Sequence, residues 1–398
     1  MSIFATARIL LPRDVDMEKW AVIACDQFTS QPDYWQRVEQ TVGQAHSALR
    51  LILPEAELEE ASPERIPGIH AAMRDYLERG LFQVWEDAFV YVERQLLDGS
   101  IRRGLVGALD LEQYDYREDS RAAVRATERT VLERIPPRQK IREGAALELP
   151  HVLLLCDDPA DGILAPLTAT RESLPQLYDF SLMEGGGRIR GWLVQGQAAR
   201  ETRARLAAYE SVGGMRYAVG DGNHSLASAK ACWEAKKKSL PAEHPARYAL
   251  VELENLWDES QKIEPIHRIL KGVDPQALLA QAREKIGAET GHRLCWYSGG
   301  QSGTLTLDAR LGLLPVGILQ EFLDAYLATH PGQIDYIHGE ETLRHLAQAP
   351  DSLGFLLPGI GKDQLFGGIS ADGVLPRKTF SMGHAQEKRY YLEAREIL

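Results

Sequence analysis

Short runs of apolar residues alternate along this chain with stretches in which apolar side chains recur every three or four positions. The apolar runs predict short buried strands at residues 21–24, 151–155, 191–194 and 247–253. The three- and four-residue spacing predicts amphipathic helices at residues 63–79, 199–209, 275–286 and 315–328. An Asp98-Gly99 turn signal predicts a β-hairpin between residues 88–97 and 103–111. This alternation indicates an α/β or mixed α+β fold with a mixed sheet.

The most informative local pattern lies at residues 215–233. Residues 215–219 predict a strand, Gly220-Asp221-Gly222 predicts a turn, and the apolar positions after it predict a helix. A glycine turn between a strand and a helix directs free backbone N–H groups and the positive end of the helix dipole at its occupant, which is most often a phosphate. The alternative is a purely structural connection in which Asn223 or Ser225 caps the helix.

Length and charge narrow the function classes. At 398 residues the chain exceeds one ordinary core, and its net charge of −12 argues against a nucleic-acid partner. No run approaches 18 apolar residues and the N-terminus has no signal-peptide pattern, so we expect a cytoplasmic protein with no membrane partner. The four cysteines lie far apart and are expected to be reduced thiols. The oligomeric state does not follow from these patterns.

Residues 115–150 are unusually rich in arginine. Seven arginines lie between residues 117 and 142, interleaved with Glu118, Glu128 and Glu133. Residues 120–134 are expected to be partly helical, and the arginines then pair with these glutamates on the surface. The second interpretation is an anion-binding loop fixed by Thr127 to Thr130 and by Pro136-Pro137-Arg138. Both interpretations remain open from the residues alone.

A phosphoryl-transfer site needs a phosphate cradle, positive charge or a metal, and a base for the attacking hydroxyl. Residues 220–225 supply a candidate cradle, in which Asp221 could hold Mg²⁺ and His224 could bind phosphate or take a proton. Glu128 is the candidate base, with nearby arginines or Arg377-Lys378-Thr379 neutralising charge. No G-x-S-x-G, H-E-x-x-H or C-x-x-C motif is present. A metal-dependent hydrolase built on histidines stays open, with candidate ligands His224, His267 and His338.

Four motifs in sequence order resemble domain-of-unknown-function family 1015. They are Glu128-Arg129-Thr130, Gly220-Asp221-Gly222-Asn223-His224-Ser225, Pro265-Ile266-His267-Arg268 and Pro376-Arg377-Lys378-Thr379. The second resembles the alanine-aspartate-glycine-histidine-histidine-arginine run of that family, with Ser225 in place of the arginine. Its aspartate-glycine-x-histidine turn is also similar to the phosphate box of the ParB and sulfiredoxin-like superfamily, one branch of which is the free serine kinases.

The resemblance implies a ParB/sulfiredoxin-like nucleotide-binding core at residues 113–270, between an N-terminal mixed-sheet region at 1–112 and a C-terminal α/β extension at 271–398. It implies a Mg²⁺-assisted kinase that uses ATP or ADP to phosphorylate a small hydroxyl metabolite, with free L-serine the favoured substrate. The alternative is a ParB-like regulatory module that binds a nucleotide without small-molecule kinase activity.

The same resemblance assigns roles to individual residues. Asp221, His224 and Glu128 are implied as catalytic residues, with Asp221 also the Mg²⁺ ligand. Another base must replace the missing arginine, and Arg125, Arg129 and Lys378 are the candidates. The full set expected to bind the phosphates or the nucleotide is Gly220, Gly222, Asn223, Ser225, Arg125, Arg129, Thr130, His267, Arg268, Lys378 and Thr379.

Overall fold

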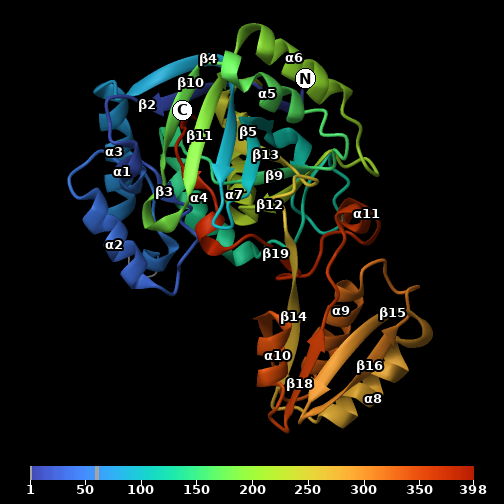
Figure 1. Ribbon diagram of the computed structural model, residues 1–398. Coiled ribbons are helices and arrows are strands. Elements are labelled where there is room, and N and C mark those ends of the chain that lie inside the picture. Colours follow the sequence, from blue (N-terminus) through green and yellow to red (C-terminus); the bar gives the residue numbers. More distant parts are fainter. Residues whose placement is uncertain (1, 59–61) are drawn as a thin grey trace.

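The computed structural model describes residues 2–58 and 62–398, which form a large and a small lobe joined by one long strand (Figure 1). The large lobe is built on an eleven-stranded mixed sheet of order β10-β11-β4-β5-β13-β9-β12-β7-β6, with β1 paired to β5 and β2 to β4. Its strands are β1 (Phe4–Ala5), β2 (Ala7–Pro12), β4 (Phe82–Gln95), β5 (Ile101–Asp110), β6 (Tyr114–Asp115), β7 (Val124–Ala126), β9 (Leu153–Cys156), β10 (Gln176–Ser181), β11 (Arg188–Val194), β12 (Tyr217–Asp221) and β13 (Tyr248–Asn255).

Both faces of this sheet are buried. Along β4, Val90 and Val92 pack into one core while Phe89 and Tyr91 pack into another, because successive strand residues point to opposite faces. The first core also contains residues of the N-terminal helices, and the second contains residues of α6 and α7. The helices of the large lobe are α1 (Met17–Trp20), α2 (Pro32–Val42), α3 (Arg65–Glu78), α4 (Ile135–Glu143), α5 (Ala165–Thr170), α6 (Gly196–Ala208) and α7 (Asn223–Lys236).

The small lobe has a six-stranded sheet of order β16-β15-β18-β14-β17, with β19 paired to β14. Residues 263–265 of β14 pair with β19 and residues 266–271 pair with β17, so β14 connects the lobes. The strands are β14 (Ile263–Lys271), β15 (Gly287–Ser298), β16 (Gln301–Leu307), β17 (Gln333–His338), β18 (Ser352–Leu356) and β19 (Phe380–Met382). The helices are α8 (Pro275–Ile286), α9 (Pro315–Leu327) and α10 (Glu340–Leu346). Helix α11 (Lys362–Asp372) lies against the large lobe, where the Ser370 hydroxyl donates to the Val212 carbonyl at 3.3 Å (Figure 1).

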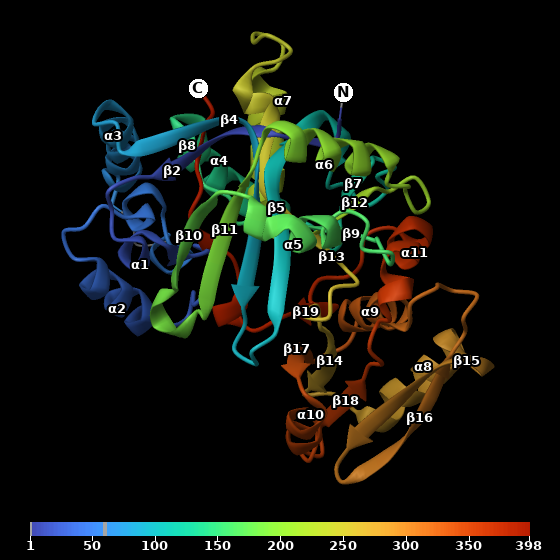
Figure 2. The same ribbon diagram turned by 45° about the horizontal axis from the view of Figure 1, so that its top comes forward.

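The end of the chain returns to the large lobe (Figure 2). Strand β20 (Tyr390–Tyr391) pairs with β3 (Val22–Ile23), and β21 (Arg395–Glu396) pairs with β8 (Leu147–Glu148). In the large sheet, β4 and β5 from before residue 112 lie between β11 and β13 from after it. The division at residues 112 and 270 stays a prediction, and neither boundary coincides with the edge of a sheet.

The structure confirms the mixed α/β fold, the hairpin of β4 and β5, and the four predicted helices. The helix predicted for part of residues 120–134 is wrong except for a 3₁₀ turn at Leu132–Arg134. Residues 124–126 instead form β7, which pairs in parallel with both β12 and β6, and the helix α4 begins only at Ile135, where two prolines occupy its first turn. Within residues 2–58 and 62–398, no helix is both long and apolar enough to cross a membrane.

Candidate functional site

The turn between β12 and α7 forms an open helix start. Gly222 is the N-cap residue, at φ +80°, and the first helical bond runs from the Leu226 N–H to the Gly222 carbonyl at 3.0 Å. A Cβ at Gly222 would lie 3.0 Å from the Cα of Val152, so the close approach of the two backbones requires glycine. No side chain of the described chain caps the helix, so the predicted caps Asn223 and Ser225 are wrong. The free N–H groups of the first turn suit an anion.

Strand β7 brings Glu128 to the same end of the sheet as Asp221. The two strands are parallel, with Ala126 opposite Val219, and the Thr127 hydroxyl donates to the Val219 carbonyl at 2.7 Å. Glu128 therefore follows β7 where Asp221 ends β12. This strand pairing brings Glu128 and Asp221 to the same end of the sheet although they are far apart in sequence.

Glu128 and Arg268 hold the segment 376–379 from two sides. The Glu128 carboxylate accepts the N–H groups of Lys378 at 3.1 Å and Thr379 at 3.0 Å. The Arg268 guanidinium, which is fully buried, donates to the Lys378 carbonyl at 2.9 Å and to the Gln320 side chain at 2.7 Å. Lys378 has φ +53°, a strained conformation for a residue with a side chain. Three of the four motifs thus meet at this clamp, which consists of Glu128, Arg268 and the backbone of 376–379.

Burial governs the titration of both clamp residues. It raises the pKa of Glu128, although the N–H groups of Thr379 and Lys378 act in the opposite direction. It lowers the pKa of Arg268 to about 10, because an ion is less stable away from water. Glu128 is thus held by backbone N–H groups, and Arg268 by backbone carbonyls and the Gln320 side chain.

His224 lies among three guanidinium groups. Its Nε2 accepts the N–H of Val131 at 3.1 Å, so the neutral ring carries its proton on Nδ1. Burial and, after it, the positive charges of Arg138, Arg134 and Arg377 lower the His224 pKa to about 4, although Asp26 acts in the opposite direction. Arg138 is also ion-paired with Glu55, whereas Arg134 and Arg377 have no carboxylate partner within residues 2–58 and 62–398, so the place around His224 keeps a net positive charge from these two.

Two buried oxygens at this place have no partner. The Thr130 hydroxyl, next to Val131, and the Asn223 side-chain oxygen, in the first turn of α7, form no hydrogen bond within the described residues. Buried polar atoms are nearly always paired, to protein or to a bound molecule. The two oxygens are consistent with a ligand in this electropositive place.

Asp221 is shared between the turn and a lysine from the C-terminal segment. One oxygen accepts the N–H of Gly222 at 2.9 Å, and the other lies 3.3 Å from Nζ of Lys388.

Asp26 lies nearby: burial opposes its ionisation, but His151, Gln27, Lys388 and Arg138 lower its pKa. Asp26, His151 and Lys388 were not predicted as site residues. The signal for Asp26 was a polar loop directly after a buried strand, whereas His151 and Lys388 reach the site only through the fold.

Three residues predicted to bind the nucleotide lie elsewhere. Arg125, the middle residue of β7, is buried, and its Nε donates to the Ala122 carbonyl at 2.8 Å. His267 belongs to the small lobe, and its Nδ1 accepts the N–H of Leu357 at 3.2 Å. Arg129 forms an ion pair with Glu118 at 3.3 Å. The arginines near the turn are instead Arg134, Arg138 and Arg377.

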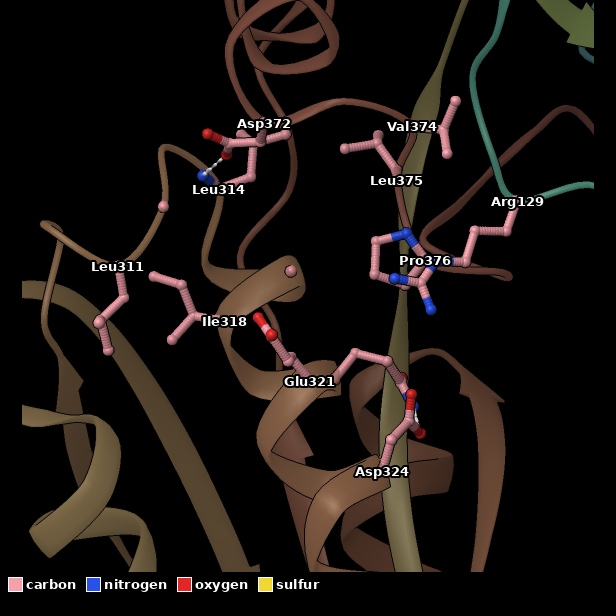
Figure 3. Close-up of a pocket in the computed structure, with 13 residues that line it drawn as sticks. Arg129, Leu311, Leu314, Ile318, Glu321, Asp324, Asp372, Val374, Leu375 and Pro376 are labelled. Atoms are coloured by element: carbon pink, nitrogen blue, oxygen red, sulfur yellow. Dashed lines mark hydrogen bonds between the residues drawn. The ribbon is translucent and has the colours of Figure 1, made fainter. Parts of the chain in front are cut away.

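Arg129 also faces a pocket of about 350 Å³ between the lobes (Figure 3). The pocket is lined on the opposite side by Glu321 and Asp324 of α9 and closed at one end by Asp372, which accepts the N–H of Leu314 at 3.2 Å. It is bounded by Leu375 and Pro376, immediately before the clamped segment. Arg129 is thus directed at this pocket and not at the turn.

The described residues contain no group of three or more His, Cys, Asp or Glu side chains that could hold a metal ion. The histidine cluster considered above is therefore not assembled, since His267 and His338 belong to the small lobe. Mg²⁺ usually binds through one or two carboxylates together with substrate phosphates. Asp221 fits that mode as a single ligand, with Lys388 as a neighbouring cation.

Several solved structures are similar to this chain at low identity. SbnI with a C-terminal truncation from Staphylococcus aureus is 12% identical, with a TM-score of 0.38 over 70% of this chain and 82% of that chain. A free serine kinase mutant in complex with AMP is 11% identical, with a TM-score of 0.41 over 72% and 90%. A conserved hypothetical protein from Pyrococcus furiosus is 12% identical, with a TM-score of 0.32 over 72% and 90%.

No curated protein matches the chain. The sequence model of one family, described as a protein of unknown function (DUF1015), matches residues 9–331. That match covers most of the chain and includes the motifs at Glu128, Gly220 and Pro265, whereas the motif at Pro376 lies beyond it. The chain therefore belongs to the DUF1015 family of proteins of unknown function.

Proposed function

We propose that this protein binds a nucleotide through its phosphates at the start of α7 and transfers a phosphoryl group to a small hydroxyl metabolite. The observation that carries the proposal is the uncapped first turn of α7 with Arg134, Arg138 and Arg377 close to a neutral His224. A helix start and a group of guanidiniums are two independent sources of affinity for phosphate.

The proposed phosphate contacts follow from the groups that are free. The N–H groups of residues 223–225 face the end of the helix, and the His224 Nδ1–H has no protein acceptor within the described residues. Arg377 is exposed and forms no ion pair in the described part of the chain. Arg377, together with the exposed Arg134, replaces the cation that the family motif carries at position 225, where this chain has Ser225.

In the proposed reaction, the acceptor hydroxyl oxygen forms a bond to the terminal phosphorus while the bridging P–O bond breaks and the shortened nucleotide leaves. The hydroxyl proton passes to Glu128, which retains free lone pairs after accepting two backbone N–H groups, and whose pKa is raised by burial. Mg²⁺, when bound with the nucleotide, neutralises charge on the phosphates next to Asp221.

ATP and ADP are the proposed donors, and free L-serine is the acceptor to test first, because the motif resemblance implies both. A regulatory module that binds a nucleotide without kinase activity is the second candidate. It is favoured by the space beside Gly220, Asp221 and Lys388, which measures about 10 Å³. That is roughly the room of one water molecule and too small for an acceptor.

The experiment is a melting-temperature screen with ATP, ADP and CTP, each with and without Mg²⁺, followed by a phosphotransfer assay with L-serine. A ligand at a hundred times its Kd adds about 2.7 kcal/mol of stability. The shift with ATP or ADP should be lost in Arg377→Ala and kept in Arg200→Ala, an exposed arginine on α6.

Transfer to serine that is lost in Asp221→Asn supports the kinase. A shift without transfer to any hydroxyl metabolite supports the regulatory module. If no nucleotide changes the melting temperature, the start of α7 is a structural turn only.

A further inference from the structure

A second cavity, of about 120 Å³, opens beside the first turn of α7. We call it the apolar pocket. Its floor is apolar, formed by Leu51, Ile52, Leu53, Met73 and Ile141. Ser225 and Ser228, which lie three residues apart on one face of α7, form its wall. The apolar pocket therefore runs along the helix turn whose N–H groups face the proposed phosphates.

The apolar pocket and the phosphate site share residues. Ser225 belongs to the turn motif and Arg138 is one of the guanidiniums around His224, yet both line the apolar pocket. His151 lies between the two places. A Cβ at Gly222 would lie 3.3 Å from the His151 Cδ2, and the His151 Nδ1 is bonded to the Tyr391 hydroxyl at 2.8 Å. The apolar pocket therefore adjoins the phosphate site.

The lining offers unpaired backbone groups as well as apolar surface. A short 3₁₀ turn (Ala48–Leu51) ends at Ile52, which is extended at φ −127° and ψ 165°. Neither Ile52 nor Leu53 forms a backbone hydrogen bond among residues 2–58 and 62–398. An aliphatic ligand would leave such groups without partners, whereas a flat heteroaromatic ring can stack on the apolar floor and bond to them at its edge.

The volume of the apolar pocket also fits a flat heteroaromatic ring. Pockets that enclose whole drug-sized ligands measure roughly 300–1,000 Å³. The apolar pocket, at about 120 Å³, has room for one ring system and not for a larger molecule. We infer that it binds the base of the nucleotide whose phosphates lie at the start of α7; this inference rests on the proposed function.

The test compares ATP with inorganic tripolyphosphate, which carries the phosphates without a base, by isothermal calorimetry on the full chain. Ile141→Trp places a large ring at the half-buried edge of the apolar pocket. Leu313→Trp is the matched control, at a residue that is 49% exposed in the small lobe. Circular dichroism and the melting temperature without ligand establish that each variant folds.

The unmodified protein should bind ATP at least about tenfold more tightly than tripolyphosphate, a difference of about 1.4 kcal/mol. Ile141→Trp should remove that advantage and leave tripolyphosphate binding unchanged, and Leu313→Trp should change neither. If a folded Ile141→Trp variant loses ATP and tripolyphosphate equally, or binds ATP as before, the base does not lie in the apolar pocket.

The two ligands also separate this inference from the proposed function. Equal affinity of the unmodified protein for ATP and tripolyphosphate overturns the base site and leaves the phosphate site standing. Binding of neither ligand overturns both. Preference for ATP that survives in Ile141→Ala but not in Ile141→Trp supports a ring-sized occupant, because the smaller side chain leaves the pocket open.

Discussion

The pKa of His224 provides a direct test of the proposed phosphate site. Burial and the three neighbouring guanidiniums lower this pKa to about 4. A dianion bound at the start of α7 would screen those positive charges and favour the imidazolium, so binding should be accompanied by proton uptake. Sulfate is the better probe, because unlike a phosphate ester it does not titrate between pH 5 and 8.

The magnitude follows from the two pKa values. If sulfate restores the ordinary value of about 6.5, its affinity should be about 30-fold higher at pH 5 than at pH 8. Without ligand, a falling pH weakens the folded state. The unfolded chain binds the His224 proton below pH 6.5 and the folded protein does not, so folding stability is lost as the pH falls from 6.5 to 4. Because His224 is only half-buried, that loss should stay below the about 3 kcal/mol of a fully shielded group.

The assay is NMR titration of protein labelled at the histidine Cε1 position, with calorimetry of sulfate binding at pH 5, 6, 7 and 8. His224→Gln identifies the resonance, since the glutamine oxygen can still accept the Val131 N–H. It should also remove most of the pH dependence. His345→Gln, at an exposed residue of α10, is the control. A His224 pKa near 6.5 in the free protein, or a sulfate affinity that ignores pH in this window, refutes the reasoning.

Gly222→Ala and Gly99→Ala both place a methyl group at positive φ, +80° and +85°, but only the first meets other atoms, at 3.0 Å. We therefore expect ATP affinity to fall about tenfold or more in Gly222→Ala and to be unchanged in Gly99→Ala, and equal losses in calorimetry would contradict this. Glu128→Gln should lower kcat for phosphotransfer by about 100-fold or more while the Kd for ATP changes little; an unchanged kcat would leave Glu128 only its loop-holding role. Arg268→Met removes the donor of the Lys378 and Ile266 carbonyls and of the Gln320 side-chain oxygen, so it should destabilise the clamp by about 2–4 kcal/mol. Hydrogen exchange at residues 376–380 measures that loss, and protection equal to that of the unmodified protein would show that Arg268 is not needed there.

The periodic part of the fold was predictable from sequence because each element signals its own geometry. The hairpin of β4 and β5 follows from alternating apolar residues around Asp98-Gly99, and α9 from apolar residues at helical spacing. The segment 120–134 was predicted wrongly because its composition favours a helix whereas the neighbouring strand decides the outcome. Pairing with β12 converts residues 124–126 into β7, and no local pattern contains that information.

The candidate site was predictable to the extent that it is local. The turn at residues 220–225 is contiguous, and its glycine, aspartate and histidine could be named from spacing alone. The arginine that lies near His224 could not be predicted, because nothing in the local sequence distinguishes Arg125 from Arg138. Arg125 is buried within β7 and bonded to the Ala122 carbonyl, whereas α4 carries Arg138 to His224. Lys388 required knowledge that the C-terminal segment returns to the large lobe.

The clamp gives the distant motifs a common physical explanation. Glu128 comes from the large lobe and Arg268 from the strand that enters the small lobe, yet both bind the backbone of residues 376–379. Burying two charges is costly unless each is fully bonded, and here each is bonded to a segment that holds Lys378 at φ +53°. Arg377, next to that strained residue, contributes positive charge to His224. A shift of the small lobe would displace Arg268, release the segment and move this charge, so the arrangement of the lobes and the electrostatics of the start of α7 are coupled through three residues that no local pattern connects.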